Sequence, residues 1–471
     1  MLIDGQWLPA EDGDLQPVRN PATGDWVGSI AAAGARETTR AIRSAQEAWP
    51  GWRALLPQER GNILLEWARL MRGAREDLAL IMTLEQGKPL FEARGEIDYA
   101  ASFLEWFAAE AARAYGETIP SHLPGRQLMT VREPIGVAAA ITPWNFPSAM
   151  ITRKAGAALA AGCPMIVRPA SETPFCALAL GVLAMRAGIP RGVLSVITGD
   201  PQPIAEVLTS SEAVRAISFT GSTEVGRLLL QHSASSIKRV SLELGGHAPF
   251  LVFEDADVEQ AVTWALAAKF QTSGQDCLAA NRILVHRSLM PRFREAFAAQ
   301  TQALRVGNGL DPEVVIGPLI SEKAVIRCQR HVHDAVAHGA TVLTGGGPHP
   351  AGKNFFTPTV LDGVTPEMLI CREETFGPVA ALLSFESEAE AVRIANNTIY
   401  GLAAYICTRD LARAMRVGGH LEYGMIAINT SRFTGPPIPF GGMKQSGLGR
   451  EGSRHGLDDY TELKYLCIGL E

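Results

Sequence analysis

The chain has 471 residues, of which 47% are hydrophobic and 20% are charged, and its formal net charge is −6. This composition is typical of a globular protein of two or three domains, and it excludes a disordered or fibrous chain. The acidic balance argues against nucleic acid or an anionic membrane as the main partner. No basic segment followed by an apolar one opens the sequence and no uncharged run spans a bilayer, so we expect a cytoplasmic protein without membrane contact.

Seven cysteines are spread thinly through the sequence, without C-x-x-C pairs or His/Cys clusters. A disulfide framework and a structural zinc site are therefore not expected, and we place no metal at the functional site. The thiols should be reduced, as a thiol nucleophile requires.

Residues 36–116 have a helical pattern, with apolar side chains such as Ile63, Leu64 and Trp67 on one face. Residues 117–137 look like strands between breakers and predict an excursion from the main body. The tail 460–468 alternates like a terminal strand.

Short apolar runs alternate with helical segments from residue 135 onward. We predict buried parallel strands at 135–141, 165–167, 193–197 and 216–219, with helices at 148–161, 174–188, 201–210 and 223–234. This alternation indicates a doubly wound α/β sheet, which binds ligands, nucleotides above all, at the carboxyl ends of its strands. Residues 246–440 show the same alternation of strands and helices and are long enough for a second domain.

A single cysteine, Cys277, follows a helical pattern that starts at residue 258 and ends at Ser273-Gly274. A turn that leads into a helix N-terminus lowers the pKa of a cysteine, so the pattern predicts an activated nucleophile. The alternative is a small buried hydrophobic residue.

Two other polar side chains lie in unusual contexts. Glu243 ends an apolar run before two glycines, where burial would raise its pKa toward the range of a general base; a structural salt bridge is the alternative. Asn145 lies in a loop stiffened by two prolines, where its amide could donate to an oxyanion; a turn or helix cap is the alternative.

The stretch 218–226 runs from a strand through a glycine turn into a helix, as pyrophosphate sites do.

Six stretches, in this order, resemble the aldehyde dehydrogenase superfamily, and the resemblance covers essentially the whole chain. They are T-P-W-N-F-P at 142–147, F-T-G-S at 219–222, E-L-G-G at 243–246, G-Q-x-C at 274–277, E-T-F-G-P-V at 374–379 and P-F-G-G at 439–442. The resemblance implies an α/β fold with a Rossmann-type cofactor domain (1–116 and 138–245), an α/β catalytic domain (246–440) and a small β flap for oligomerisation (117–137 and 455–471). It also implies a homodimer or homotetramer.

The resemblance implies the chemistry as well. Cys277 would attack an aldehyde, Asn145 would hold the oxyanion, hydride would pass to a nicotinamide, and Glu243 would activate the water that hydrolyses the thioester. Lys154 matches a lysine that supports the site near Asn145. The positions that match cofactor contacts are Thr142, Pro143, Trp144, Arg168, Ser171, Glu172, Gly221, Ser222, Gly226, Leu244, Glu374 and Phe376.

Two positions bear on the choice of cofactor. The family usually has lysine where this chain has Arg168, and NAD-specific members have glutamate where it has Ser171. An arginine and a hydroxyl can both bind a 2′-phosphate. We expect NADP to be accepted as well as NAD, and leave open whether NADP is preferred.

Several stretches (150–156, 168–174, 246–250 and 456–465) resemble the succinate-semialdehyde dehydrogenase branch. In that branch an arginine that matches Arg153 binds the distal carboxylate of the substrate, and a second arginine falls on Gln271 here. We place Arg153, Gln271 and Ser431 in the substrate site. Arg432, in the loop 429–437, either supplies the missing charge or is a solvated surface arginine.

The leading prediction is therefore oxidation of an ω-carboxylated semialdehyde such as succinate semialdehyde. Glutarate semialdehyde, lactaldehyde or a similar small aldehyde is the alternative. Glu243 disfavours a coenzyme A-acylating enzyme, which needs no water-activating base, and the set Asn145, Glu243 and Cys277 disfavours a non-enzymatic role. Because Ala279 stands where some relatives have a second cysteine, we predict no disulfide switch.

Overall fold

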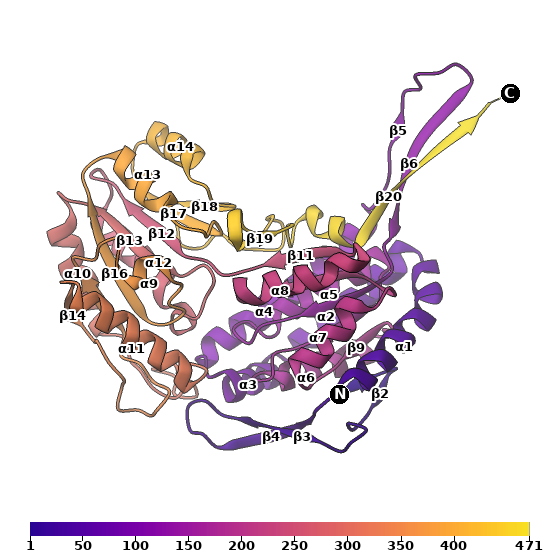
Figure 1. The fold of residues 1–471 in the computed structure, drawn as a ribbon, viewed down its shortest axis with the longest axis horizontal. Helices are drawn as coiled ribbons and strands as arrows, with labels where there is room; N and C mark the ends of the chain where they lie inside the picture. The colour runs from indigo at the N-terminus through magenta and orange to yellow at the C-terminus, as the bar shows by residue number, and fades with distance from the viewer. Residues whose placement is uncertain (471) are drawn as a thin grey trace.

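The computed structural model describes residues 1–470, which form two large sheets, a three-stranded sheet and a two-stranded sheet. We call the two large ones the first and the second sheet. Figure 1 shows that the chain builds the first sheet with the helices around it, crosses to the second, and returns at its C-terminal end.

The first sheet has the strand order β19-β11-β10-β7-β8-β9-β1-β2. Its parallel strands are β7 (Val137–Ile141), β8 (Met165–Arg168), β9 (Leu194–Val196), β10 (Val214–Thr220) and β11 (Arg239–Glu243); at the edges lie β1 (Leu2–Ile3), β2 (Gln6–Trp7) and β19 (Gly447–Leu448). The order reverses between β7 and β10, which is the switch point of a dinucleotide-binding sheet.

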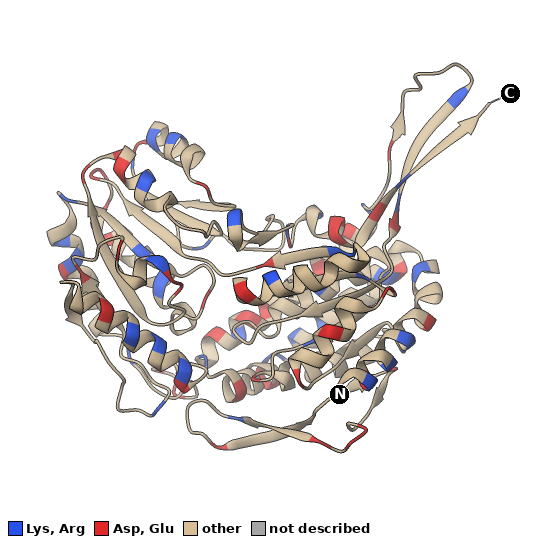
Figure 2. Cartoon of the chain, in the orientation of Figure 1, with Lys and Arg blue, Asp and Glu red and all other residues tan. Residues whose placement is uncertain are grey.

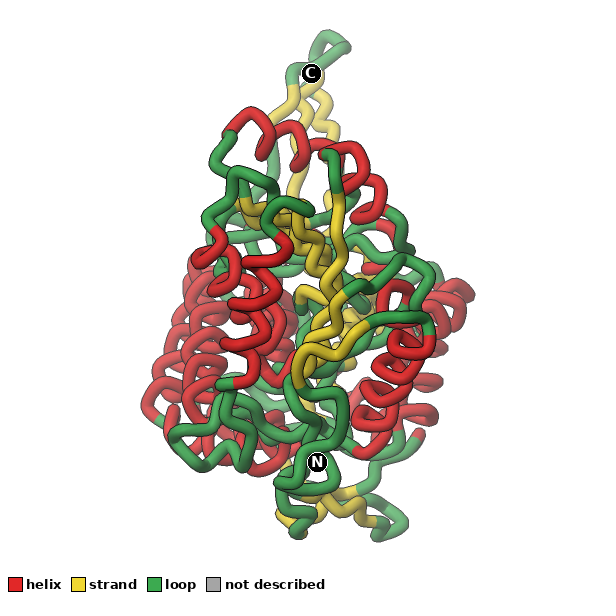
Figure 3. Tube along the Cα trace, turned by 90° about the vertical axis from the view of Figure 1, so that its left-hand side faces the viewer, coloured by secondary structure: helices red, strands yellow, loops and turns green. Residues whose placement is uncertain are grey.

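Helices cover both faces of the first sheet because successive side chains of its strands point to opposite sides. Ala138 and Ala140 belong to one apolar cluster, whereas Ala139 and Ile141 belong to the other. The helices are α1 (Ala35–Ala54), α2 (Pro57–Gly73), α3 (Arg75–Gln86), α4 (Leu90–Ala111), α5 (Ala149–Ala161), α6 (Pro174–Arg186), α7 (Pro201–Ser210) and α8 (Thr223–Ser233), followed by the 3-10 turn η1 (Ala234–Ser236). Figure 3 shows strands between two layers of helix.

The second sheet has the order β14-β15-β16-β13-β12-β17-β18, and only β14 is antiparallel. Its strands are β12 (Ala248–Val252), β13 (Ala280–His286), β14 (Thr341–Thr344), β15 (Thr359–Asp362), β16 (Val379–Phe385), β17 (Ala403–Cys407) and β18 (Met425–Ile428). Its helices are α9 (Val258–Phe270), η2 (Gln271–Gly274), α10 (Met290–Gln302), α11 (Glu322–Ala337), α12 (Leu369–Arg372), α13 (Glu388–Asn396) and α14 (Leu411–His420).

The remaining strands lie outside the two large sheets. β5 (Thr118–Ile119), β6 (Arg126–Pro134) and β20 (Thr461–Gly469) form a three-stranded flap that projects from the body together with the C-terminus (Figure 1). β3 (Leu15–Arg19) and β4 (Trp26–Ala31) form a hairpin, and two 3-10 segments, η3 (Lys444–Ser446) and η4 (Arg454–Tyr460), precede the last strand.

The two large sheets meet through opposite ends of their strands. β11 ends at Glu243 and β12 begins at Ala248, so the carboxyl edge of the first sheet leads directly to the amino edge of the second. Cys277 lies three residues before β13, at the same amino edge. We call each large sheet with its helices a unit. The chain thus brings residues from both units to one junction.

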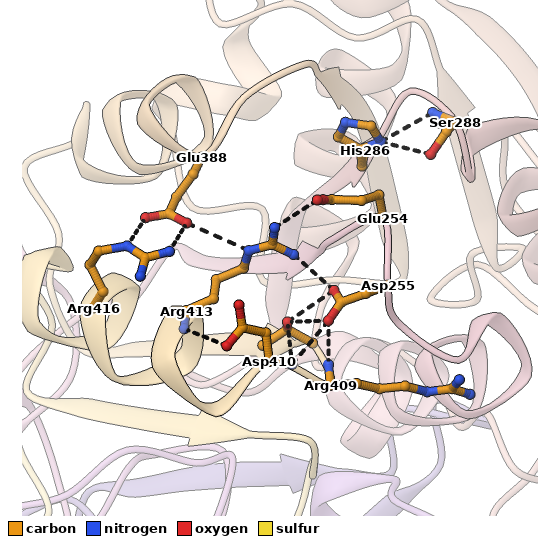
Figure 4. A network of polar contacts seen from close by, with 10 residues as sticks. Glu254, Asp255, His286, Ser288, Glu388, Arg409, Asp410, Arg413 and Arg416 are labelled. Atoms are coloured by element: carbon orange, nitrogen blue, oxygen red, sulfur yellow. Dashed lines mark hydrogen bonds and ion pairs between the residues drawn. The ribbon is translucent and has the colours of Figure 1, made fainter.

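The carboxyl edge of the second sheet is closed by side chains of its own (Figure 4). The Asp255 carboxylate accepts hydrogen bonds from the Thr408 hydroxyl and from the backbone N–H groups of Arg409 and Asp410. Arg413 donates to Asp255 at 2.9 Å and to Glu254 at 2.6 Å. An internal carboxylate therefore occupies the N–H groups that could hold a ligand at the end of a parallel strand.

This network predicts an unequal pair of arginine variants. Arg413 has an 18% exposed side chain, contacts three carboxylates and lies over the Phe253 ring, whereas Arg416 is about half exposed and pairs with Glu388. We expect Arg413→Leu to lower the thermal unfolding midpoint by roughly 5 °C, because the substitution leaves partly buried carboxylates without their cationic partner. Arg416→Leu should change it by less than about 2 °C. Equal shifts in calorimetry would contradict this role of Arg413.

Within the described chain, no helix combines the length and the apolar character needed to cross a membrane. Figure 2 shows acidic and basic residues interspersed along the helices of both units.

Candidate active site

Two glycines let the two units touch. A Cβ atom at Gly246 would overlap the carbonyl oxygen of Cys277, and one at Gly245 would lie 2.8 Å from a carboxylate oxygen of Glu374. Only glycine permits this approach. The E-L-G-G stretch therefore brings Glu243 toward the turn that carries the cysteine.

A strained turn presents Cys277. Thr272, Ser273 and Gly274 have φ values of 50°, 58° and 72°, which for the two residues with side chains costs of order 1 kcal/mol each. The surrounding structure holds the turn: the Glu92 carboxylate accepts from the Thr272 N–H at 3.0 Å, and the Ser273 hydroxyl donates to the Gly317 carbonyl at 3.0 Å. Such strain is typical of functional sites.

The expectation of an activated thiolate at a helix N-terminus is wrong. Strand β13, not a helix, follows Cys277. Burial raises the pKa of the Cys277 thiol well above its ordinary value, and the carboxylates of Glu243 and Asp276 raise it further. The resting cysteine is therefore a neutral thiol, and its proton must move to a base when it attacks.

Glu243 is the base that the geometry offers. It ends β11 and is buried, and neither carboxyl oxygen has a hydrogen-bond partner among residues 1–470. Burial, and then the charge of Glu451, raises the pKa of Glu243 to about 8. A carboxyl group with such a pKa can accept and release a proton near neutral pH.

A buried cluster of charges lies beside Glu243. Lys154 donates to the Ser218 hydroxyl at 2.9 Å and pairs with Glu451, to which Arg153 also pairs at 3.4 Å. Burial opposes ionisation of Glu451, but Lys154 and Arg153 outweigh it, so the pKa of Glu451 is lowered. Lys154 thus bonds to Glu451 and Ser218, and no hydrogen bond to Asn145 is found in the described chain.

Asn145 is fixed from both ends. Its side-chain amide donates to the backbone carbonyl of Gln275 at 3.1 Å, and Gln275 lies two residues before the cysteine. The backbone carbonyl of Asn145 accepts from the Lys88 ammonium at 2.7 Å. Lys88 pairs with Glu96 at 2.5 Å, and both side chains are buried. Glu96 also accepts from the Ser148 N–H at the start of α5. A preorganised amide donor suits an oxyanion hole.

The sequence analysis missed Lys88, Glu96 and Glu451. Lys88 follows Gly87, which ends α3 in a left-handed conformation, and Glu96 lies on α4 eight residues later. A charged residue next to the end of a helix is normally exposed to solvent. The pairing of Lys88 with Glu96 is therefore seen only in the contacts of the folded chain. Glu451, in the glycine-rich stretch 447–452, carried no signal at all.

The predicted cofactor residues gather at the switch point of the first sheet. Thr142, Pro143 and Trp144 follow β7, and Gly221 and Ser222 follow the adjacent β10. Ser222 caps α8, whose N–H groups can face an anion.

Gly226 and Leu244 play packing roles beside this crevice. A Cβ atom at Gly226 would overlap the Leu244 side chain, so the glycine lets α8 lie against the end of β11.

Glu374 and Phe376 enter the same crevice from the second unit. Glu374 accepts from the Gly246 N–H at 2.9 Å, and burial raises its pKa to about 7. Phe376, with φ of 51°, packs edge-on against Trp144 at 5.5 Å between ring centres. Residues of both units therefore meet beside the switch point.

Arg168 and Ser171 lie together at the end of β8. Arg168 is 7% exposed and donates to the Ser171 hydroxyl at 2.8 Å and to the Gly199 carbonyl at 3.0 Å. Its Nε has no partner within the described residues, and Glu172 is exposed next to Ser171. An arginine beside a hydroxyl at the carboxyl end of a parallel strand fits a nucleotide ribose or its phosphate.

A cavity of about 840 Å³ opens onto Cys277. Arg153, Gln271 and Ser431 all line it, as do Lys88, Glu92, Tyr99, Phe146, Asp276, Tyr405, Arg432, Phe433, Thr434 and Phe440. The structure therefore brings the three predicted substrate residues into one cavity with the cysteine. Its size and its mixture of aromatic walls and a few polar groups are typical of a small-molecule site.

Comparisons with known proteins agree with this arrangement. The model of the Aldehyde dehydrogenase family matches residues 7–466. The chain is 55% identical to a succinate-semialdehyde dehydrogenase [NADP(+)] of Escherichia coli, over 100% of this chain and 97% of the relative. It is 54% identical to a glutarate-semialdehyde dehydrogenase of Pseudomonas aeruginosa, over 99% and 97%. A crystal structure of an E. coli NADP-dependent enzyme superposes with a TM-score of 0.99 at 55% identity, covering 100% of this chain and 98% of that one.

Proposed function

The chain belongs to the aldehyde dehydrogenase family, and on that premise we propose that it oxidises a semialdehyde with a distal carboxylate to the dicarboxylic acid, reducing NAD or NADP. The observation that supports the proposal is that Cys277 lines the cavity, that the Asn145 amide donates to the Gln275 carbonyl two residues before it, and that the charge of Glu243 acts on the Cys277 thiol. The overall reaction consumes the aldehyde, water and the oxidised cofactor, and releases the acid, the reduced cofactor and a proton.

The first half of the reaction forms a covalent bond to the enzyme. The Cys277 sulfur attacks the carbonyl carbon while its proton passes to Glu243, whose raised pKa suits it to accept one. The Asn145 amide and the Cys277 N–H donate to the developing oxyanion. NAD or NADP, held by the residues named below, would supply the acceptor for the hydride.

The second half frees the acid. Glu243 first releases to solvent the proton that it took from Cys277, and then removes a proton from a water molecule, which attacks the thioester. The intermediate collapses to the carboxylic acid as Glu243 returns this proton to the departing Cys277 sulfur. Burial raises the pKa of Glu243 most and Glu451 raises it further, while Arg153 and Lys154 lower it, so this cluster adjusts the pH range in which the base works. An acylating enzyme would hand the acyl group to coenzyme A and would not need Glu243.

Four groups of residues would hold the cofactor. Thr142 to Trp144 would line the nicotinamide side, the start of α8 at Ser222 would face the pyrophosphate, Glu374 would bind the nicotinamide ribose, and Arg168 with Ser171 would meet the adenosine ribose.

The Ser171→Glu variant tests the adenosine end. We expect its kcat/KM for NADP to fall by roughly 50-fold, since a carboxylate repels a 2′-phosphate, while kcat/KM for NAD is retained or rises. Ser235→Glu, at an exposed serine after α8, should leave the ratio of the two values unchanged. An unchanged ratio in Ser171→Glu would place the 2′-phosphate elsewhere.

The substrate class is tested with a panel of aldehydes. Succinic and glutaric semialdehydes should have higher kcat/KM values than propanal, betaine aldehyde, glycolaldehyde and lactaldehyde, with both cofactors. The similarity to a succinate-semialdehyde dehydrogenase and to a glutarate-semialdehyde dehydrogenase supports this ranking. A preference for an uncharged or cationic aldehyde would refute the substrate class.

We also propose a homodimer or homotetramer assembled through the projecting flap. Apolar side chains are exposed on β20, among them Leu463, Tyr465 and Ile468, which a neighbouring subunit would cover. A monomer in sedimentation velocity would contradict this.

We propose a division of the chain into three parts: a cofactor domain of residues 1–116 and 138–245, a catalytic domain of residues 246–440, and a flap of residues 117–137 and 455–471. A cytoplasmic location suits the free thiol that the mechanism requires.

A further inference from the structure

The cations around the substrate cavity are not equally available. Lys88, Arg153 and Arg432 are the lysine and arginine residues that line it. Lys88 is buried and pairs with Glu96. Arg153 has a 1% exposed side chain, pairs with Glu451 and donates to the Tyr99 hydroxyl at 3.2 Å. Two of the three cations are thus already engaged by protein groups.

Arg432 is different from these two. Its residue is exposed, and its guanidinium makes no hydrogen bond or ion pair with any described side chain or backbone group. Its backbone N–H donates to the Thr430 hydroxyl at 3.1 Å, and that hydroxyl donates to the Arg432 carbonyl at 3.2 Å. This local pair of bonds defines the backbone that carries the free cation.

The loop that carries Arg432 is anchored beside the cysteine. The next residue, Phe433, packs edge-on against Tyr405 at 5.5 Å, and Tyr405 donates to the Leu278 carbonyl at 2.9 Å. Phe433 and Cys277 also pack against the same apolar cluster around Phe440. Arg432 therefore extends from a segment whose position relative to Cys277 is set by packing.

Carboxyl groups also line the cavity. Burial raises the pKa of Glu92 and of Asp276, which favours their neutral forms. A distal carboxylate of the substrate still needs a cation, because a buried carboxylate without a partner is unfavourable. Gln271, which also lines the cavity, supplies only an amide.

We propose that Arg432 is a specificity-determining residue that binds the distal anionic group of the substrate, together with Arg153. The inference rests on the proposed function and deepens it: the enzyme selects aldehydes whose carboxylate or sulfonate, far from the carbonyl, reaches the loop 429–437. Arginine can bind either oxyanion in a bidentate fashion.

The test compares charged and uncharged aldehydes of equal chain length in three variants. For Arg432→Leu we expect kcat/KM for succinic and glutaric semialdehydes to fall by roughly 10- to 100-fold, the range of a lost charge-assisted hydrogen bond, while the values for butanal and pentanal change by less than about 3-fold. Arg432→Lys should keep the preference for the charged aldehydes in part. Arg186→Leu, at an exposed arginine on α6 outside the cavity, should change nothing. A sulfonated aldehyde of similar length separates carboxylate from sulfonate selection.

Two failures can be told apart. A wild-type enzyme that prefers the alkanals refutes the proposed substrate class. A wild-type enzyme that prefers the semialdehydes, with an Arg432→Leu variant that keeps that preference or loses activity equally on charged and uncharged aldehydes, refutes the role of Arg432 alone.

Discussion

Cys277→Ala abolishes aldehyde-dependent reduction of both dinucleotides, with kcat/KM at least about 10⁴-fold below that of the wild type. The reason is that no other thiol reaches the cavity: among the cysteines, only Cys277 lines it. Without the sulfur there is no tetrahedral intermediate from which hydride can leave. The measurement is the absorbance of the reduced cofactor under saturating aldehyde.

The matched control is Cys467→Ala, which removes an exposed cysteine on β20. It should retain full activity. Cys277→Ala should also keep the thermal unfolding midpoint within about 2 °C, because the side chain is only partly buried and the turn is held by other residues. Residual turnover above about 1% of the wild-type rate would contradict the covalent mechanism.

Glu243→Gln separates hydride transfer from hydrolysis. We expect a burst of reduced cofactor that is slower than in the wild type, because the thiol proton must then pass to solvent. It should be followed by a steady state roughly 10³-fold slower than that of the wild type, because glutamine cannot take a proton from the attacking water. Rapid mixing with absorbance detection resolves the two phases. Glu206→Gln, at an exposed glutamate of α7, is the control and should show wild-type turnover. A variant that loses burst and steady state in equal measure would mean that Glu243 acts only before hydride transfer.

The pH dependence follows from the same residue. The pKa of Glu243 is raised to about 8, so the working carboxylate is the minor form at pH 6 and the major form at pH 9. The rate of thioester hydrolysis should therefore rise with pH and reach half of its maximum near pH 8, with about one hundredth of the groups ionised at pH 6. A rate that stays constant between pH 6 and pH 9 would contradict this assignment.

Much of the fold could be predicted because buried parallel strands are continuous apolar runs in the sequence. The runs before Thr142, Arg168 and Gly221 become β7, β8 and β10, and the helices between them appear close to the expected bounds. The N-terminal strands β1 to β4 were missed. β1 and β2 have only two residues each, and the pairing of β1 with β2 and with β9 cannot be detected from periodicity.

The candidate site could also be predicted only in part from the sequence. Cys277, Glu243, Asn145 and Glu374 lie in short stretches whose residue types suggest chemistry, and the structure brings them to one junction. The electrostatics could not be predicted. The raised pKa of Cys277 depends on burial and on carboxylates brought in by tertiary contacts, Glu243 among them, which no local pattern encodes.

The most direct test of the central claim, that Cys277 carries the acyl group while Glu243 releases it, is mass spectrometry of the Glu243→Gln variant. The variant is mixed with succinic semialdehyde and NADP, quenched after the burst and digested. The peptide that contains Cys277 should carry the mass of a succinyl group in thioester linkage. An unmodified Cys277 peptide alongside a full burst of reduced cofactor, or an acyl group found on another residue, would contradict the account.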